Sequence, residues 1–413
     1  MTIDETAKTA PPAAKKDPHP ALFLILMSPF GIATGYAVTT LGFQLGHNGV
    51  SAGMVAGMVS AGLLPQVIKV LWAPIVDITL TSKHWYVIGA AAEGLAILVC
   101  STSPATQGAV PFLTLLVVIS SFASTFTSMA GETMMASLHN DLKGAASGWG
   151  QAGNFAGQGI GGGLGLFLAT HVAQGWVSGA GLFALCMACA VGLFFVAEPD
   201  RLHTRSNIVL TLGQVLQDVW AMMKSRLGLL CCLIMLLPIG TSAASNLWAA
   251  IAGDWRAGAD TVSLSTGAVG GVLTAFGCLA GGYACDRLDR KTAYCLFGLL
   301  VSVSLVAMAL AARTPSMFVV FTLSYAIITG ACYAAYSAVV LEAIGRGAAA
   351  TKFNLMASIA NVPVLLMTQG DGWFHDRGGA NLMLYGEAAC GVVAVLMFGG
   401  IVALWPRRGA AGA

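Results

Sequence analysis

The stretch GGYACDRLDRK, from Gly281 to Lys291, joins two long apolar runs through a short charged turn. The run before it, 261–284, and the run after it, 292–312, are both close to the roughly 20 residues that a helix needs to cross a bilayer. A polar turn between two such runs is typical of consecutive transmembrane helices. The same alternation of apolar runs and polar turns continues in both directions along the chain.

The composition of the whole chain supports this interpretation. Of its 413 residues, 57% are hydrophobic and only 9% are charged, whereas a soluble domain carries about 25% charged residues. The apolar runs are continuous and lack the alternating pattern of transmembrane β-strands. The formal net charge of +2 gives no support to a nucleic-acid partner. We therefore predict an all-α membrane protein.

Apolar runs separated by turn residues predict twelve transmembrane helices in two six-helix bundles, residues 21–197 and 227–405. The expected spans are 21–44, 51–76, 85–104, 110–136, 147–170, 176–197, 227–250, 261–284, 292–312, 316–344, 351–370 and 381–405. Residues 1–20 and 406–413 are expected to be tails, the first of them flexible. Residues 198–226 form a longer polar linker, with the spacing of an amphipathic helix that lies along the membrane surface.

Basic residues predict the orientation, because cytoplasmic loops of membrane proteins are enriched in Lys and Arg. With the N-terminus inside, sixteen of the 20 basic residues fall on the cytoplasmic side, and only Arg256, Arg313 and Arg377 fall on the other. Both termini are therefore predicted to be cytoplasmic. Lys69 is the one basic residue left inside a predicted span.

Matching features at corresponding positions of the two halves indicate an internal repeat. The span 51–76 runs into APIVDITLTSK and the span 261–284 into GGYACDRLDRK, so Asp77 and Asp286 both precede a basic turn. The stretches KGAAS (143–147) and RGAAAT (346–351) follow corresponding spans in the same way. Internal repeats are the usual architecture of secondary transporters.

The stretch Gly281–Lys291 resembles the loop motif of the major facilitator superfamily, roughly G-x-x-x-D-R-x-x-R-[RK]. The matching residues are Gly282, Asp286, Arg287, Arg290 and Lys291. The resemblance implies the twelve-helix major facilitator fold, transport by alternating access and a location in the bacterial cytoplasmic membrane. It also implies that Asp286, and Asp77 in the weaker first-half copy, are gating residues. In this superfamily the motif Asp lies against the N-terminus of a helix of the other half in the outward-facing state, where the helix dipole favours a carboxylate.

A narrower resemblance concerns LPQVIKVLWAPIVD (64–77), which fits the pattern P-x-x-x-K-x-L-W-A-P-x-x-D. It looks like the second-helix signature of AmpG-like muropeptide permeases and the related acetyl-coenzyme A transporters. The glycine-rich stretch 143–165 is similar to the fifth helix of that family. The resemblance implies uptake of a muropeptide or another anionic metabolite, coupled to protons. That family usually has Gln-Asp and a second Asp in its fourth helix, where this chain has only Glu132. A siderophore or drug-like solute is therefore the alternative, and a non-transporting membrane sensor is a second one.

Ionisable groups inside spans are candidates for function. Lys69 either extends to solvent or pairs structurally, or it contacts an anionic solute or a carboxylate. Glu93 could pair with Lys69 or bind a coupling proton. Glu132 and Glu342 occupy corresponding positions near the ends of their spans, which favours gate contacts with Lys143, Arg346 or a motif arginine.

Polar side chains grouped on single helix faces are candidates for the lining of a solute cavity, because the first, fourth, seventh and tenth helices line it in the superfamily. These residues are Tyr36, Thr40, Gln44, Gln151, Asn154, Gln158, Asn246, Tyr325, Thr329, Tyr333, Tyr336, Asn354 and Asn361. Glu387 is expected at the membrane interface.

Glycine spacing predicts close helix contacts. Gly153, Gly157, Gly161 and Gly165 recur every four residues, and the span 261–284 has similar pairs. Small residues at this spacing let helices approach closely. Because the fifth and eighth helices meet across the two halves in the superfamily, these glycines suit a rocking interface. Simple tight packing of helices is the alternative.

The sequence lacks the residues that several other classes of protein need for their function. The ten cysteines lie in apolar segments without metal-binding spacing, and the seven histidines are scattered, so no metal or cofactor is expected. Nucleotide-binding loops and catalytic motifs are also missing, so the chain is not expected to be an enzyme. The expected partners are a small-molecule substrate, protons and the lipid bilayer, and the protein is expected to be a monomer.

Overall fold

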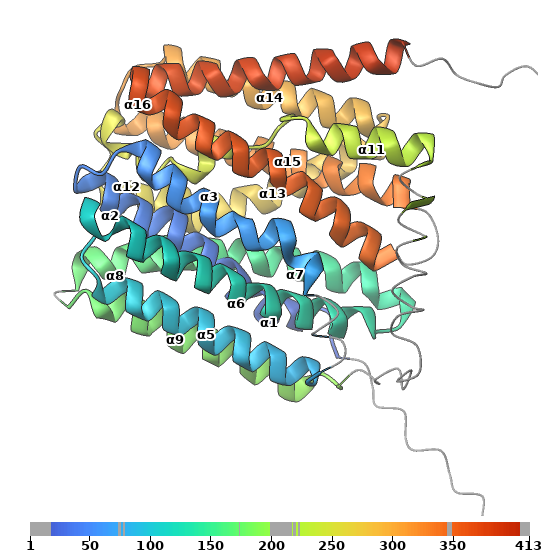
Figure 1. The fold of residues 1–413 in the computed structure, drawn as a ribbon, viewed down its shortest axis with the longest axis horizontal. Helices are drawn as coiled ribbons and strands as arrows, with labels where there is room; N and C mark the ends of the chain where they lie inside the picture. The colour runs from blue at the N-terminus through green and yellow to red at the C-terminus, as the bar shows by residue number, and fades with distance from the viewer. Residues whose placement is uncertain are drawn as a thin grey trace, which may run out of the picture.

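The computed structural model describes residues 18–72, 76, 79–172, 174–198, 217, 220–221, 224–344 and 349–404. Throughout these residues, every regular element is helical (Figure 1). Asp77, Pro74, most of the predicted surface helix between the halves, and most of both predicted tails lie outside the described residues.

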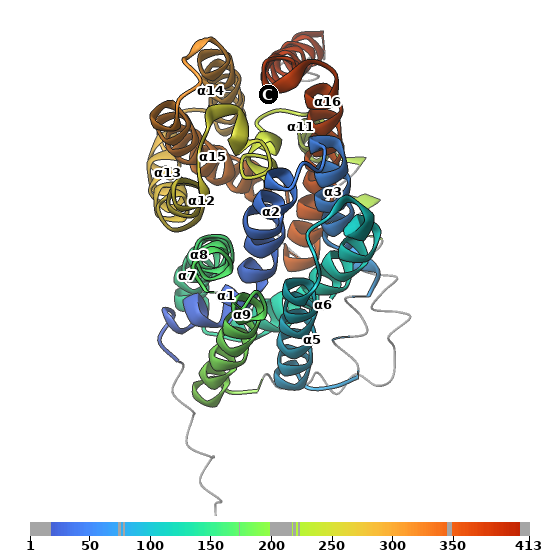
Figure 2. The ribbon, with the colours of Figure 1, turned by 90° about the vertical axis from the view of Figure 1, so that its left-hand side faces the viewer.

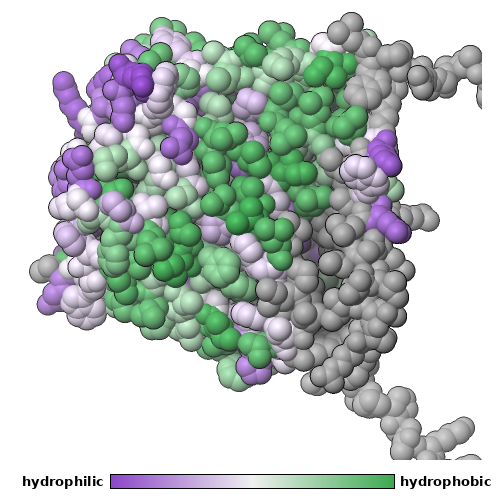
Figure 3. Space-filling view, in the orientation of Figure 1, coloured by the Kyte–Doolittle hydropathy of each residue, from purple (hydrophilic) through white to green (hydrophobic). Residues whose placement is uncertain are grey.

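Eight helices in the described part are long and apolar enough to cross a membrane. They are Leu22–His47, Ser82–Thr102, Gln107–Ala136, Trp176–Phe195, Ala259–Cys285, Arg290–Leu310, Pro315–Ala343 and Asn354–Ala403. Hydrophobic residues cover the middle of the molecular face in Figure 3, and hydrophilic residues gather at its left-hand end. This distribution fits a protein surrounded by lipid.

Three of the long helices contain a π-helical segment between two α-helical parts. The π segments are η1 (Tyr36–Leu41) between α1 (Leu22–Gly35) and α2 (Gly42–His47), η4 (Ile160–Leu164) between α7 (Asn140–Gly159) and α8 (Gly165–His171), and η8 (Ser263–Ala268) between α12 (Ala259–Val262) and α13 (Val269–Cys285). All three π segments contact one another. A π turn leaves backbone carbonyls without their usual partners, and hydroxyl groups bind those of η4: Thr40 donates to the Gly161 and Gly162 carbonyls, and Ser263 donates to Gly163.

The remaining elements follow the predicted spans closely in most places. They are α3 (Ala52–Ile68), η2 (Lys69–Leu71), α5 (Ser82–Thr102), α6 (Val110–Ala136), α9 (Trp176–Cys189), η5 (Ala190–Phe195), α11 (Arg226–Leu236), η6 (Ala243–Asn246), η7 (Ala252–Trp255), α14 (Arg290–Leu310), α15 (Pro315–Ile344) and α16 (Ala349–Leu404).

Two predicted helix boundaries are wrong. The expected span 227–250 is α-helical only to Leu236, because Pro238 cannot continue the hydrogen-bond pattern and Gly240 and Ser242 adopt positive φ angles of 58° and 55°. The expected gap at 371–380 is also misplaced. The helix continues past residue 370, and the non-helical residues within α16 are Gly378 and Gly379.

Contacts within and between the two halves of the sequence define the packing. In the first half α1 packs on α7, and α5 packs on α6 and α9. In the second half α13 and α14 pack on α15. Between the halves, α3 packs on α16 and α7 on α13. Figure 2 shows the helices of the second half, α11–α16, in the upper part of the molecule and α5–α9 in the lower part, with α2 and α3 reaching up toward α16.

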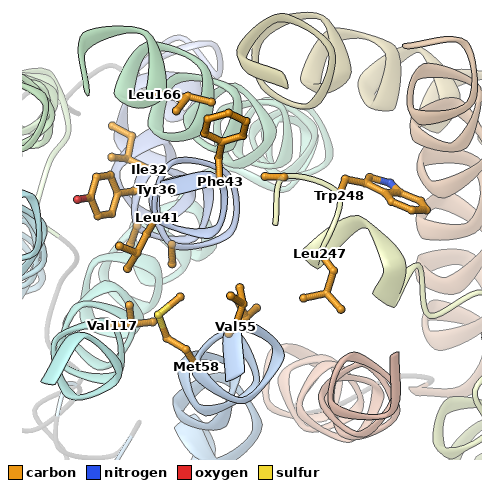
Figure 4. Packing of buried hydrophobic residues seen from close by; sticks show 14 of the residues in the cluster. Ile32, Tyr36, Leu41, Phe43, Val55, Met58, Val117, Leu166, Leu247 and Trp248 are labelled. Atoms are coloured by element: carbon orange, nitrogen blue, oxygen red, sulfur yellow. The ribbon is translucent and has the colours of Figure 1, made fainter. Parts of the chain in front are cut away.

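Two ends of the molecule are distinguished below. The Asp254 end carries the junction of α2 and α3, the η7 segment and the Gly378–Gly379 turn, and it lies on the left of Figure 1. The Lys69 end, on the right, carries both ends of the described chain. Near the Asp254 end the halves share a buried apolar core, in which Leu247 and Trp248 lie opposite Phe43 and Val55 (Figure 4).

Candidate functional site

Lys69 belongs to a polar cluster that joins the two halves of the chain. Its Nζ lies 3.7 Å from Oε1 of Glu132, and only 10% of its side chain is exposed. The second carboxylate oxygen of Glu132 accepts a hydrogen bond of 3.1 Å from Nδ2 of Asn354 on α16. Ser128, one turn earlier on α6, donates to Oε1 over 2.9 Å. The lysine is thus buried and paired, and it does not extend into solvent.

Local structure holds Lys69 in this place. The α-helix α3 ends at Ile68 and continues as a single 3₁₀ turn from Lys69 to Leu71. Trp72 then fixes this turn to α6, because its indole N–H donates to Oγ1 of Thr125 over 3.0 Å and its ring packs on Phe122. The tighter turn therefore places the lysine between two helices of the first half, facing the second half.

Glu93 does not pair with Lys69, so the suggested Lys69–Glu93 ion pair is wrong. Glu93 is fully buried between helices of the first half, where Thr127 of α6 and Cys186 of α9 are its polar neighbours, at 3.4 and 3.6 Å. Among the described residues no cation contacts it. The reason is geometric: the face of α5 that carries Glu93 packs against α6 and α9, away from α3.

A second polar cluster surrounds the irregular segment after α11. Glu387 is buried there, although it was expected at the membrane interface. Its carboxylate accepts hydrogen bonds from the backbone amides of Ala243 and Ala244, at 3.0 and 2.9 Å, and from the hydroxyls of Thr241 and Tyr325, both at 3.3 Å. These amides are free because the chain is not α-helical there, so a carboxylate replaces the missing helical acceptors.

Asp371 lies beside Glu387 and was missed by the sequence analysis. The predicted span 351–370 stops one residue before Asp371, so Asp371 was expected in the turn that follows it. A detectable signal existed: Asp371 precedes the Gly378–Gly379 turn by seven residues and Glu387 follows it by eight. A turn joins two antiparallel helices, so residues at nearly equal separations from that turn lie at the same depth.

Several predicted cavity residues bind one another within the second half. Thr329 donates to Oγ of Ser242 over 2.9 Å, and Asn246 donates to Oγ1 of Thr368 over 2.8 Å, which joins α15 and α16 to the irregular segment. Tyr333 lies between the halves, because its ring contacts that of Phe155 on α7 as well as that of Tyr336.

Other predicted residues lie elsewhere or form local bonds. Tyr36 lines a small cavity within the first half, and Thr40 binds the η4 carbonyls. Gln158 donates to Asn154 one turn away on α7. Gln44, Gln151 and Asn361 are half-buried on α2, α7 and α16.

The predicted gating residues at the Lys69 end form contacts within the second half. Glu342 accepts from Lys291 over 2.8 Å and lies 3.9 Å from Arg290. The guanidinium of Arg287 stacks on the Tyr283 ring. Asp286 is exposed, and its carboxylate accepts no hydrogen bond from any described residue, so the helix contact expected of the motif Asp is not made within the described part of the chain.

An equivalent contact exists at the opposite end of the molecule. Asp376 of α16 accepts hydrogen bonds from the Gly53 amide and the Ser51 hydroxyl, both 3.0 Å long, at the N-terminus of α3. The exposed amides and the dipole of α3 favour a carboxylate there. Nearby, Gly46 of α2 touches the backbone of Ala250, and His375 contacts Asp254 at 2.8 Å. A surface cavity of about 400 Å³ lies among these residues. These contacts join the halves at the Asp254 end.

The glycine stripe of α7, η4 and α8 faces α1, so its predicted contact with the eighth helix is wrong. A Cβ at Gly153, Gly157 or Gly161 would collide with the carbonyl of Leu24, Ser28 or Ile32. The contact between the halves uses the adjacent face, where Gly159 and Gly163 meet Gly267. Four-residue spacing places all members of the first stripe on one face, and α1 occupies that face.

The helical architecture and the repeated polar elements agree with a comparison of sequence families. Residues 20–368 match the family profile of the Major Facilitator Superfamily. The chain belongs to this superfamily. The prediction of a multi-pass membrane transporter is confirmed at this level.

Solved structures of the superfamily share the fold. The xylose transporter from E. coli in a partially occluded inward open conformation is 13% identical, with a TM-score of 0.68 over 95% of this chain and 100% of that chain. A nucleoside transporter is 16% identical, with a TM-score of 0.68 over 94% and 100%. A bacterial homologue of the human lysosomal transporter Spinster is 12% identical, with a TM-score of 0.66 over 92% and 95%. No curated protein matches the sequence significantly.

Proposed function

We propose that this superfamily member is a proton-coupled secondary transporter that takes up a polar organic anion, such as a muropeptide, as the AmpG-like permeases do. In this proposal twelve spans form two six-helix bundles, residues 21–197 and 227–405. The protein acts as a monomer in the bacterial cytoplasmic membrane, with both termini inside. Sixteen basic residues on the predicted inner side support this orientation.

The observation that carries the proposal is the paired Lys69. A lysine buried between the halves is costly unless a carboxylate compensates it, and Glu132 does so here. An anionic group of the solute can take the place of Glu132 beside Lys69. Glu132 retains Ser128 and Asn354 as donors when it leaves the lysine. Binding of the anion would therefore change the contact that joins the turn after α3 to α6.

The described state fits an inward-facing transporter. With the termini inside, the contacts of Asp376 with α3 and of Gly46 with Ala250 close the outer side. The superfamily resemblance associates the Asp286 contact with the outward-facing state, and the Asp286 carboxylate binds none of the described residues here. We infer that Asp286 and Asp376 engage helix ends in opposite states of the cycle.

A group of aromatic residues that spans the two halves favours a siderophore or drug-like solute as the second candidate. Phe155 of the first half and Tyr333 and Tyr336 of the second half form a continuous group of rings, with centroids 5.6 and 5.8 Å apart. Such a group binds flat rings, either of aromatic or of sugar type. An anionic siderophore with aromatic groups would use both Lys69 and these rings.

Uptake into proteoliposomes tests both candidates. Purified protein is reconstituted, a pH gradient with an acidic exterior is imposed, and radiolabelled muropeptides and siderophores are offered. We expect accumulation of one class by the natural protein, and loss of this accumulation in Lys69→Ala, which should still insert into the membrane. Lys224→Ala, which removes an exposed basic residue, is the matched control and should transport normally. Normal uptake by Lys69→Ala would show that Lys69 does not bind the solute.

A further inference from the structure

Asp371 is a buried carboxyl group without a donor. Its exposed fraction is 0%, and neither of its oxygens accepts a hydrogen bond from any described protein group. Buried polar groups are nearly always hydrogen-bonded, since leaving one unpaired costs about 1–3 kcal/mol and more for a charged group. A buried Asp371 carboxylate would therefore be strongly unfavourable.

Glu387, the neighbour of Asp371, is in the opposite situation. Its carboxylate already accepts from two backbone amides and two hydroxyls, which are the donors that stabilise an ionised carboxylate. The carboxyl group of Asp371 adjoins it. Two carboxyl groups can form a hydrogen bond only when one of them carries a proton, so a single proton on Asp371 satisfies both groups.

The other titratable groups around the pair do not supply a positive charge. Tyr325 of α15 donates to Glu387, and Cys390 lies one turn along α16. His375 lies one turn after Asp371 but contacts Asp254. Arg313 stacks on Trp255 and binds Asn381 nearer to the turn. On α3, the residues facing Gly372 are Ala52, Gly53 and Ala56.

We propose that Asp371 and Glu387 share one proton and that this pair is the site where the coupling proton binds and leaves. The proton-binding part stands on the pair itself, whereas its role in coupling rests on the function proposed above. When the proton is bound, the protonated Asp371 carboxyl group donates a hydrogen bond to the Glu387 carboxylate. When the proton leaves to water, two adjoining carboxylates remain.

The position of the pair connects proton loss to movement between the halves. Asp371 lies on the part of α16 that packs on α3, where Gly372 contacts Ala52, Gly53 and Ala56 and Asp376 binds the N-terminus of α3. Glu387 holds the irregular segment after α11. Two like charges in contact repel strongly at low dielectric constant. Deprotonation therefore drives these two parts of the second half away from each other and loosens the closure at the Asp254 end.

Infrared difference spectroscopy tests proton binding without any solute. The natural protein, reconstituted in lipid, is moved between acidic and alkaline buffer, and the C=O stretching band of protonated carboxylic acids is recorded. We expect a band that disappears in alkali and is missing in Asp371→Asn, while Asp260→Asn, which removes an exposed carboxylate, keeps it. An unchanged band in Asp371→Asn would overturn the proposal. Thermal unfolding verifies that each variant is folded, and Glu387→Gln, expected to alter the same band, replaces Asp371→Asn if that variant does not fold.

Transport assays then separate the coupling role from the proposed function. In Asp371→Asn we expect accumulation driven by a pH gradient to fall to the level of empty liposomes, while exchange of labelled for unlabelled solute continues. Retained gradient-driven accumulation would overturn the coupling role. If the natural protein moves no solute but the band behaves as expected, the proposed function fails and the proton site stands. Loss of the band on addition of Na⁺, with uptake driven by a sodium gradient, would overturn the assignment to a proton.

Discussion

Lys69 shows how much one side chain can indicate before a structure is known. A lysine inside an apolar span predicts either a functional or a paired residue, and the structure places it in contact with Glu132 of the next helix but one. The identity of the partner could not be derived, because Glu93 and Glu132 lie on the two helices that follow α3 in the sequence. Which of them faces α3 depends on the rotation of each helix about its axis. That rotation is set by packing among apolar faces that look alike in sequence.

A double-mutant cycle tests the pair formed by Lys69 and Glu132. Removing one partner leaves a buried charge, which costs about 3–5 kcal/mol in fully buried pairs, and we expect the lower end because Glu132 is 31% exposed. Lys69→Met and Glu132→Gln should each lower the unfolding temperature in detergent, whereas the double variant should recover most of the loss. His171 and Asp260, an exposed pair, provide the control, and Asp260→Asn should change little. Additive losses would show that the two side chains are not coupled.

At the scale of helices, the face that each helix presents was harder to predict than its existence. Most apolar runs form helices near their expected limits, because composition and length decide that property. The span after Arg226 stopped early at a proline and two residues with positive φ, and α16 continued through residues that read as a polar turn. Both differences concern polar residues that are satisfied by partners distant in sequence. Glu387 and the amides of Ala243 and Ala244 are an example.

The glycine face between α1 and α7 gives a prediction about helix packing. In Gly157→Ala the new methyl group would collide with the Ser28 carbonyl and with Gly31, so α1 must move away. We expect a lower unfolding temperature and a smaller yield of folded protein. Gly148→Ala on the same helix is the control, because nothing lies within 4 Å of a methyl group there and alanine favours a helix. Equal stability of the two variants would show that α1 and α7 are not in close contact.

At the scale of the whole molecule, charge distribution and repeats were informative from sequence, whereas the conformational state was not. The Major Facilitator fold follows from twelve apolar runs and the motif at Gly281–Lys291, and the family match agrees with it. Which end is closed depends on contacts between the halves, such as Asp376 with Ser51. In the alternating cycle proposed above, these contacts form in only one state, and one amino-acid sequence must encode both states.

Cross-linking tests whether the Asp254 end must open during the cycle. The variant Ser51→Cys with Asp376→Cys places two thiols where two side chains now share a hydrogen bond of 3.0 Å. The ten native cysteines are first replaced, so that no other disulfide forms. Oxidation should stop solute uptake and reduction should restore it, and the single variant Ser51→Cys should be insensitive to both treatments. Uptake that continues in the cross-linked protein would exclude opening at this end.

The glycine face of α7 also has a consequence for how this chain can vary among its relatives. Gly153, Gly157 and Gly161 touch only backbone of α1, so natural selection should retain them as strictly as residues that recognise the solute. A library of all single substitutions, selected for growth on the solute, would therefore report two groups of intolerant positions. The groups separate when folded protein is counted in each cell: the growth of glycine variants falls in proportion to the folded protein that remains, whereas variants of Lys69 grow less well than their remaining folded protein would allow.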